Sequence, residues 1–175
     1  MHVLLEKYLQ AIKSHLPQKS LVPSVGLDVD LDSCKLIELV KKDGSFEILQ
    51  WAVEPVENAD VQGAIRRLWS RLNIQSKAPY TALSGKGTLI RYIDMPRMPP
   101  EDLKKSFDIE ADRYFPFSKD QIYTDCYILN TESQDKQVLV LVAAAKREII
   151  QERMELLTRL GFSCPSISLN SIALG

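Results

Sequence analysis

The sequence predicts a mixed α/β protein, in which a meander of strands is followed by alternating helices and strands. Two observations carry this prediction. Residues 24–53 alternate apolar and polar side chains through three short segments, as strands do. Later segments place apolar residues three or four positions apart, as helices do, and strand-like runs separate them. The composition agrees with a globular protein, since 45% of the 175 residues are hydrophobic and 26% are charged.

The same composition excludes several classes of protein. The longest apolar run, residues 138–145, is far shorter than the roughly 20 residues that cross a bilayer, and the start of the chain lacks a signal-peptide pattern. The three cysteines form no C-x-x-C pair, so neither a disulfide framework nor a zinc site is expected. A formal net charge of -1 argues against nucleic-acid binding. Both histidines, His2 and His15, precede the predicted fold, which is left without a histidine base.

The first predicted element is an amphipathic helix over residues 2–16, which Pro17 ends before a linker. One interpretation gives this helix a role at a membrane surface. Its polar face offers only Lys7 and Lys13, and it has no Trp or Phe, so docking on the protein itself or on a partner fits better. The helical spacing rests on the apolar residues Leu4, Leu5, Tyr8, Leu9, Ile12 and Leu16.

Three consecutive strands are predicted next, and together they form an antiparallel meander. Asp43-Gly44 supplies a hairpin turn between the second and third strands. Asp60 is predicted to cap a helix that ends near Asn73. The predicted strands of the meander are residues 25–31, 35–40 and 46–53.

The second half of the chain alternates strands and helices. Pro99 and Pro100 suit the first turn of a helix that Pro116 stops. Another helix carries a stripe of Ile150, Met154 and Leu157 and ends at Gly161. The remaining segments are predicted strands, at residues 80–83, 88–93, 122–129, 137–144 and 166–174, with a hairpin turn at 84–87 between the first two.

An acidic segment at the start of the meander is a candidate metal site. Asp28, Asp30 and Asp32 have the spacing of the first three ligands of an EF-hand loop. Ser33 then stands where that loop needs glycine, and Leu39 where it needs a bidentate glutamate. Exposed acids on a strand therefore explain the pattern better than a Ca²⁺ loop.

Two further motifs resemble enzyme sites only in part. The segment 84–88 reads Ser-Gly-Lys-Gly-Thr. A Walker A loop needs Ser or Thr directly after its Gly-Lys pair and another glycine five residues before the glycine of that pair, and this segment has neither. The carboxylates within residues 101–112 share their predicted helix with lysines and an arginine, which is typical of a solvated face. Neither motif predicts catalysis.

Three ordered motifs carry a resemblance to a known family. The first motif consists of Gly-Leu-Asp at residues 26–28, Ser33 and the predicted strand 35–39. The second covers residues 90–99 and 110–117 and includes the sequence Tyr-Phe-Pro-Phe. The third covers residues 138–148 and 156–161. Over residues 24–174 the chain resembles the PilM family, the cytoplasmic type IV pilus assembly proteins of the actin-like, FtsA-related superfamily.

The resemblance implies an actin-like or FtsA-like core subdomain with an inserted β-α-β-β-α subdomain. PilM proteins continue into a second half that supplies the other wall of a nucleotide cleft, so we expect this chain to represent the N-terminal half. The expected division is residues 1–22 for the amphipathic helix and linker, 23–87 for the first part of the core, 88–162 for the insertion and 163–175 for the return strand.

The resemblance also implies a nucleotide site at the opening hairpin, where Asp28 would hold Mg²⁺ and Ser33 and Lys35 would lie near phosphate. Here Asp30 replaces the family glycine that lets backbone amides approach phosphate, and Asp32 replaces a serine. A carboxylate about 4 Å from a phosphate charge costs about 1 kcal/mol in water and about 4 kcal/mol at an effective dielectric of 20. We therefore expect no cofactor and weak or absent MgATP binding. The alternative is an actin-like ATPase with a degenerate phosphate loop.

The function implied is a non-enzymatic scaffold of a type IV pilus or a related secretion system, cytoplasmic and peripheral to the inner membrane. PilM proteins hold the N-terminal tail of a PilN-like inner-membrane protein in a groove between core and insertion, a mode suited to an extended peptide. Other pilus assembly proteins are expected partners, the membrane is reached only through partners, and nucleic acid is not expected. The candidate residues for this groove are Arg91, Met95, Pro96, Met98 and Tyr114. The competing interpretation is that these side chains only pack the inserted subdomain.

Overall fold

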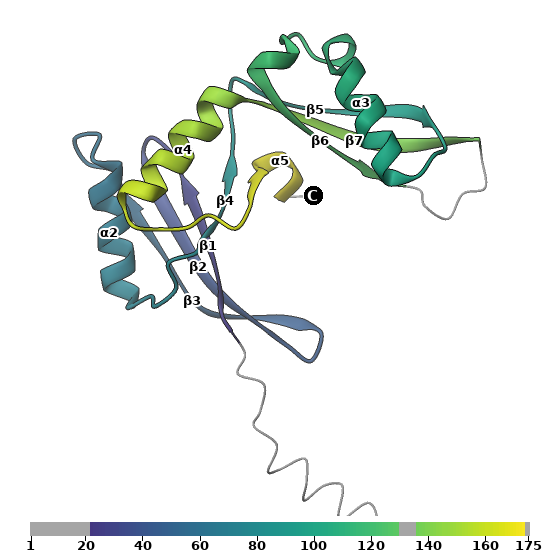
Figure 1. Ribbon diagram of the computed structural model, residues 1–175. Helices are drawn as coiled ribbons and strands as arrows, with labels where there is room; N and C mark the ends of the chain where they lie inside the picture. The colour runs from purple at the N-terminus through teal and green to yellow at the C-terminus, as the bar shows by residue number, and fades with distance from the viewer. Residues whose placement is uncertain (1–21, 130–135, 174–175) are drawn as a thin grey trace, which may run out of the picture.

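The computed structural model describes residues 22–129 and 136–173, so the helix predicted at residues 2–16 lies outside the described part. The described residues form two β-sheets, one of five strands in the order β3-β2-β1-β4-β8 and one of three strands in the order β5-β7-β6 (Figure 1). None of the helices within these residues is long and apolar enough to cross a membrane.

The first sheet opens with the predicted antiparallel meander of β1 (Ser24–Val29), β2 (Ser33–Lys42) and β3 (Ser45–Pro55). Asp43 and Gly44 have φ angles of 50° and 86°, as a two-residue hairpin turn with both central residues in the left-handed region requires. The predicted meander and its turn are confirmed.

Helix α2 (Val61–Leu72) covers one face of this sheet, next to β2 and β3. The carboxylate of Asp60 accepts a hydrogen bond of 2.8 Å from the backbone N–H of Gly63, which caps the helix as predicted. Asn73 ends the helix in the left-handed conformation, with φ 49°. The side chains that α2 buries in the core are Ala64, Ile65 and Leu68.

The hairpin predicted around residues 84–87 is wrong, although a turn is present there. Strand β4 (Tyr80–Leu83) pairs in parallel with β1 and with β8 (Ile167–Leu169) in the first sheet, whereas β5 (Thr88–Pro96) pairs with β7 in the second. The turn therefore carries the chain from one sheet to the other. The last strand is also shorter than predicted, because helix α5 (Asn170–Ala173) follows β8 directly. Ile172 lies three positions after Leu169, a spacing that suits a helix better than a strand.

The second sheet contains β5, β6 (Ile122–Ile128) and β7 (Gln137–Lys146), and α3 (Pro100–Tyr114) covers one of its faces. The predicted boundaries of α3 are confirmed, since Pro100 occupies its first turn and the chain is extended at Phe115. A single 3-10 turn, η1 (Lys119–Gln121), precedes β6. The buried core between α3 and the sheet includes Leu103, Phe107, Ala111, Val138, Val140 and Val142.

Helix α4 (Arg147–Arg159) runs from the end of β7 back to the first sheet (Figure 1). Its Leu157 is 1% exposed and belongs to the same core cluster as Val25 and Ile65. Gly161, with φ 76°, ends the turn after the helix, as predicted. The helix thus connects the two sheets by packing its second half against the first, and the division at residues 88 and 162 stays a prediction.

Candidate functional site

An apolar groove of about 510 Å³ lies between the two sheets. Its first wall is the face of the second sheet that α3 leaves uncovered, because buried Val140 and Val142 point toward α3 and the alternating residues Leu141 and Ala143 point into the groove. Its second wall is formed by β8 and α5. The apolar residues that line the second wall are Ile167, Leu169 and Ile172.

Both walls include an edge strand. Within the described residues β6 pairs only with β7 and β8 pairs only with β4, so each strand has one side without a ladder partner. Unpaired N–H and C=O groups of an edge strand can bind an extended segment, while neighbouring pockets receive its side chains. On β6, Tyr123 and Tyr127 line the groove and are 44% and 69% exposed, which leaves two aromatic rings available for contact.

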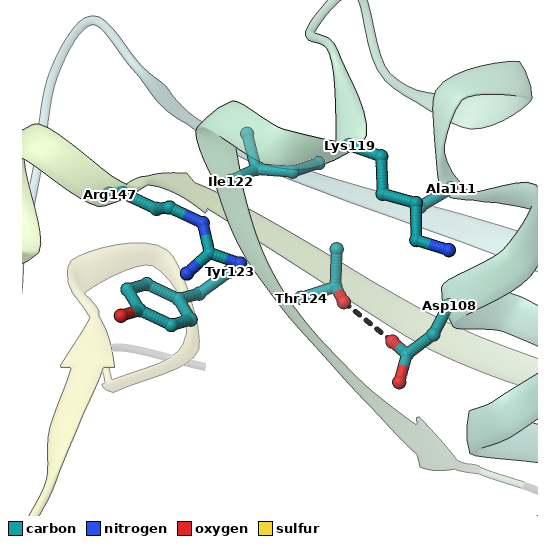
Figure 2. Close-up of a pocket in the computed structure, with 7 residues that line it drawn as sticks. All are labelled: Asp108, Ala111, Lys119, Ile122, Tyr123, Thr124 and Arg147. Carbon is teal, nitrogen blue, oxygen red and sulfur yellow. Dashed lines mark hydrogen bonds between the residues drawn. The ribbon is translucent and has the colours of Figure 1, made fainter.

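A smaller polar pocket of about 270 Å³ adjoins the groove, and Figure 2 shows its lining. The guanidinium of Arg147 lies 4.2 Å from the centroid of the Tyr123 ring, a cation–π contact. The Thr124 hydroxyl donates a hydrogen bond of 2.6 Å to the carboxylate of Asp108. Lys119 extends toward the same space. Tyr123 and Thr124 line both the pocket and the groove, so charged groups flank an otherwise apolar channel.

The four residues predicted for nucleotide lie together on the β1–β2 hairpin. The Lys35 ammonium donates to the Asp28 carboxylate at 2.8 Å, and this hydrogen bond raises the pKa of Lys35. The backbone N–H of Asp30 donates to the carbonyl of Ser33 at 3.0 Å. Asp28 therefore already has a cationic partner. In the part of the chain that the structure describes, no three His, Cys, Asp or Glu side chains cluster as a metal site would require.

The turn between β1 and β2 does not place Asp30 in the left-handed backbone conformation, with positive φ, that favours glycine. The Asp30 carboxylate accepts a hydrogen bond of 2.8 Å from the backbone N–H of Leu31, which is the kind of amide that a phosphate-binding turn presents to its ligand. Asp30 is not among the described residues with positive φ, which include Asp43 and Asn73. The Asp30 carboxylate thus already accepts the amide hydrogen that a phosphate group in this turn would need.

The predicted partner-binding residues lie away from the groove. Met95 is 5% exposed and belongs to the core under α3, and Met98 and Tyr114 pack against that core. Arg91 and Pro96 are exposed on β5, which is the opposite edge of the second sheet from β6. None of the five lines the groove, and their role as partner contacts stays a prediction.

Sequence reasoning missed the residues that do form the groove and its surroundings. The alternation of Tyr123, Asp125 and Tyr127 was a usable signal, since it places two aromatic side chains on the less buried face of one strand. Arg153 was missed as well. It lies three residues after Ile150 and four before Leu157, within the apolar stripe of its helix, a position that predicts a buried cation with specific partners.

The fold and the groove define the class of protein: a mixed α/β protein with the actin-like fold, and with an apolar channel beside two edge strands. The family model for the type IV pilus assembly protein PilM matches residues 26–174. The chain belongs to the PilM family.

Two solved structures resemble the chain. A PilM–PilN type IV pilus biogenesis complex contains a chain with 25% sequence identity and a TM-score of 0.76, and the match covers 87% of this chain and 48% of that one. This chain therefore spans about half the length of that relative. The cytoplasmic domain of EpsL, an inner-membrane component of the type II secretion system of Vibrio cholerae, matches with a TM-score of 0.56 at 10% identity, over 87% of this chain and 59% of that one. This second likeness shows the fold alone.

Proposed function

We propose that the chain is part of a scaffold for type IV pilus assembly, and that it binds the N-terminal cytoplasmic tail of a PilN-like inner-membrane protein. The observation that carries this proposal is the apolar groove between β8 and β6. Membership of the PilM family and the likeness to a PilM–PilN complex support it. The protein would act at the cytoplasmic face of the inner membrane, held there by its partners, and would also contact other pilus assembly proteins.

The chemistry of the groove favours a short, extended and mainly apolar peptide. Tyr123, Tyr127 and Leu141 offer apolar area on one wall, and Ile172 offers it on the other. The unpaired edges of β6 and β8 can hydrogen-bond a peptide backbone, which gives affinity without demanding a particular side chain at every position. Side-chain selectivity would come from the apolar pockets and from the charged groups near Arg147.

Isothermal titration with the N-terminal peptide of the PilN-like protein encoded beside this one tests the proposal. Tyr127→Asp places a charge in the groove and is expected to weaken binding at least about tenfold, because truncated aromatic anchors of interfaces cost about 2 kcal/mol or more. Ile109→Asp is the matched control, since Ile109 is 70% exposed, close to the 69% of Tyr127, but lies on α3 away from the groove. Equal affinities for the two variants would contradict binding in the groove.

We further propose that the β1–β2 hairpin binds MgATP weakly or not at all and that the protein is not an enzyme. The Asp28–Lys35 ion pair and the carboxylate of Asp30 beside the turn amide support this part of the proposal. An actin-like ATPase is the alternative. Saturable binding at millimolar MgATP, without peptide binding, would favour that alternative over the scaffold.

A further inference from the structure

The polar pocket beside the groove has an excess of positive charge. Among the described residues that line it, Arg147 and Lys119 are cationic and Asp108 alone is anionic, which leaves one positive charge unbalanced. The Asp108 carboxylate also already accepts the 2.6 Å hydrogen bond from the Thr124 hydroxyl. All of the lining residues lie between positions 108 and 147, so the pocket is built within one part of the chain.

Arg147 has a buried hydrogen-bond donor that no other described residue uses. Its Nε atom is buried and lacks a hydrogen-bond partner within the described residues. The guanidinium lies 4.2 Å from the centroid of the Tyr123 ring, and this contact orients the group but supplies no oxygen acceptor. Buried polar groups in native proteins nearly always have a partner, and an apparent exception is commonly explained by a bound water or ion. Arg147 therefore indicates an acceptor in the pocket.

The edge of β6 offers another donor at the same place. The backbone N–H of Leu129, directly after β6, donates to the carbonyl of Leu139 in β7 at 2.9 Å. Because the backbone groups of an antiparallel strand alternate in direction, the N–H groups of Thr124 and Cys126 point away from β7. The Cys126 N–H accordingly donates to the Asp125 carboxylate at 3.0 Å. The Thr124 N–H has the same direction, and Thr124 lines the pocket.

We propose that the pocket binds the carboxylate of an acidic side chain on the segment that occupies the groove. This inference rests on the proposed function and names a residue type that the partner segment must contain. Arg147 and Lys119 lie on opposite sides of β6, with Thr124 between them (Figure 2). Each would donate a hydrogen bond to the carboxylate, and charge-assisted hydrogen bonds of this kind are the stronger ones.

The geometry of the groove also sets the position of the acidic residue along the segment. Tyr123 and Thr124 line both the pocket and the groove, so a side chain can enter the pocket while the segment follows the edge of β6. Tyr127 lies three residues after Thr124 on the same strand. Two extended segments advance by nearly the same rise per residue, so the acidic residue should lie about three or four positions from the apolar residue that contacts Tyr127.

The charge of the lining favours a carboxylate over water or free phosphate. Water brings no charge to offset the excess cation. One carboxylate neutralises the single excess charge, whereas a phosphate dianion would leave the pocket with a net negative charge. A carboxylate on a segment already held in the groove also has an effective concentration in about the millimolar range, which a free anion must supply by itself.

A double-mutant cycle between protein and peptide tests the proposal. The full-length protein is titrated calorimetrically with the N-terminal peptide of the PilN-like protein encoded beside it, and with peptides in which each Asp or Glu is replaced singly by Asn or Gln. Lys119→Gln is expected to weaken binding of the unsubstituted peptide about threefold, as loss of a partly exposed charge pair does. One peptide substitution should weaken binding by the same factor in the unsubstituted protein and have no further effect in Lys119→Gln. Lys105→Gln is the matched control and should change no affinity, because Lys105 is an exposed lysine of α3 outside the pocket lining.

The other outcomes overturn the inference. Equal affinities for Lys119→Gln and Lys105→Gln, or unchanged binding of a peptide in which every Asp and Glu is replaced, would show that no carboxylate of the segment occupies the pocket. Saturable binding of inorganic phosphate that Lys119→Gln weakens, with peptide binding unaffected, would assign the pocket to a free anion. Peptide binding that Tyr127→Asp weakens and Lys119→Gln does not would leave the proposed function alone standing. Absence of peptide binding by the unsubstituted protein would overturn both.

Discussion

Arg153 on α4 donates a hydrogen bond of 3.1 Å to the carbonyl of Val29 at the end of β1, 124 residues earlier in the chain. The same guanidinium donates to the Thr81 hydroxyl at 2.8 Å and to the Ala82 carbonyl at 3.1 Å. Thr81 in turn donates to the carbonyl of Leu27 at 2.7 Å. One half-buried side chain therefore fastens the connecting helix to two strands of the first sheet, and its partial burial lowers the pKa of the guanidinium.

Arg153→Leu is expected to destabilise the protein by about 2–4 kcal/mol, because it leaves two backbone carbonyls without their donor in a half-buried site. Chemical denaturation followed by circular dichroism measures the change. Arg159→Leu on the same helix is the control, since Arg159 forms only an exposed i,i+4 pair with Glu155 and should change stability by less than about 0.5 kcal/mol. Similar losses for the two variants would show that the Arg153 hydrogen bonds contribute little.

Gly63→Ala is expected to fail as a stabilising change, although alanine normally favours a helix over glycine by about 1 kcal/mol. A Cβ at position 63 would collide with the carboxylate of Asp60 that caps the helix. In an Asp60→Ala background, where no carboxylate is present, the same change should stabilise by about 0.5–1 kcal/mol. A double-mutant cycle in urea measures this coupling, and additive effects would contradict it.

Replacing the two extra acids should strengthen nucleotide binding. In the full-length protein, Asp30→Gly combined with Asp32→Ser removes two negative charges from the turn between β1 and β2, and we expect MgATP affinity to rise at least about tenfold, since each repulsion is worth about 1 kcal/mol or more. Asp43→Gly is the control, because it removes a carboxylate from the other hairpin turn of the meander. Titration with a fluorescent ATP analogue measures the difference. Saturable MgATP binding by the parent would contradict the premise.

The Cys34 thiol should make stability depend on pH in the alkaline range. Burial, the largest cause, raises its pKa above the ordinary value of 9.0. Below pH 9.0 both folded and unfolded chains keep the proton, so this thiol adds no pH dependence. Above pH 9.0 the unfolded chain loses the proton first, and the free energy of unfolding should fall by up to about 1.4 kcal/mol per pH unit.

Cys34→Ala isolates this effect from other groups that titrate at high pH, including Lys35, whose pKa is raised by its bond to Asp28. The stability difference between the parent and Cys34→Ala should be constant up to pH 9.0 and should then shift in favour of the variant. Urea denaturation at several pH values measures it. A difference that stays constant to pH 10.5 would contradict a buried, protonated thiol.

The elements that the sequence predicted correctly are those whose signals are local. Asp43-Gly44, the Asp60 cap and the Gly161 stop each act within a few residues, so their chemistry is visible without knowledge of the fold. The family motifs added the fold class, because their order along the chain reflects the topology of the whole.

The groove could not be predicted, because it depends on which distant segments become neighbours. Tyr123 faces Ile172 across the groove only because β8 pairs with β4, and no local pattern encodes that pairing. Met95 was predicted as a partner-binding candidate within a family motif, and local sequence could not distinguish that role from packing of the insertion. In the structure β5 continues through Pro96 as an edge strand, which tolerates proline, and Met95 opposite Val138 is drawn into the core.

The strand order has a consequence for the synthesis of the protein on the ribosome. All three strands of the second sheet lie between β4 and β8 in the sequence, so this sheet can assemble while β8 is still untranslated. The first sheet is completed only when residues 167–169 emerge and pair with β4. Because β8 and α5 supply one wall of the groove, the proposed peptide site forms in a nascent chain only at this late step, and capture of a partner would report that the first sheet is complete.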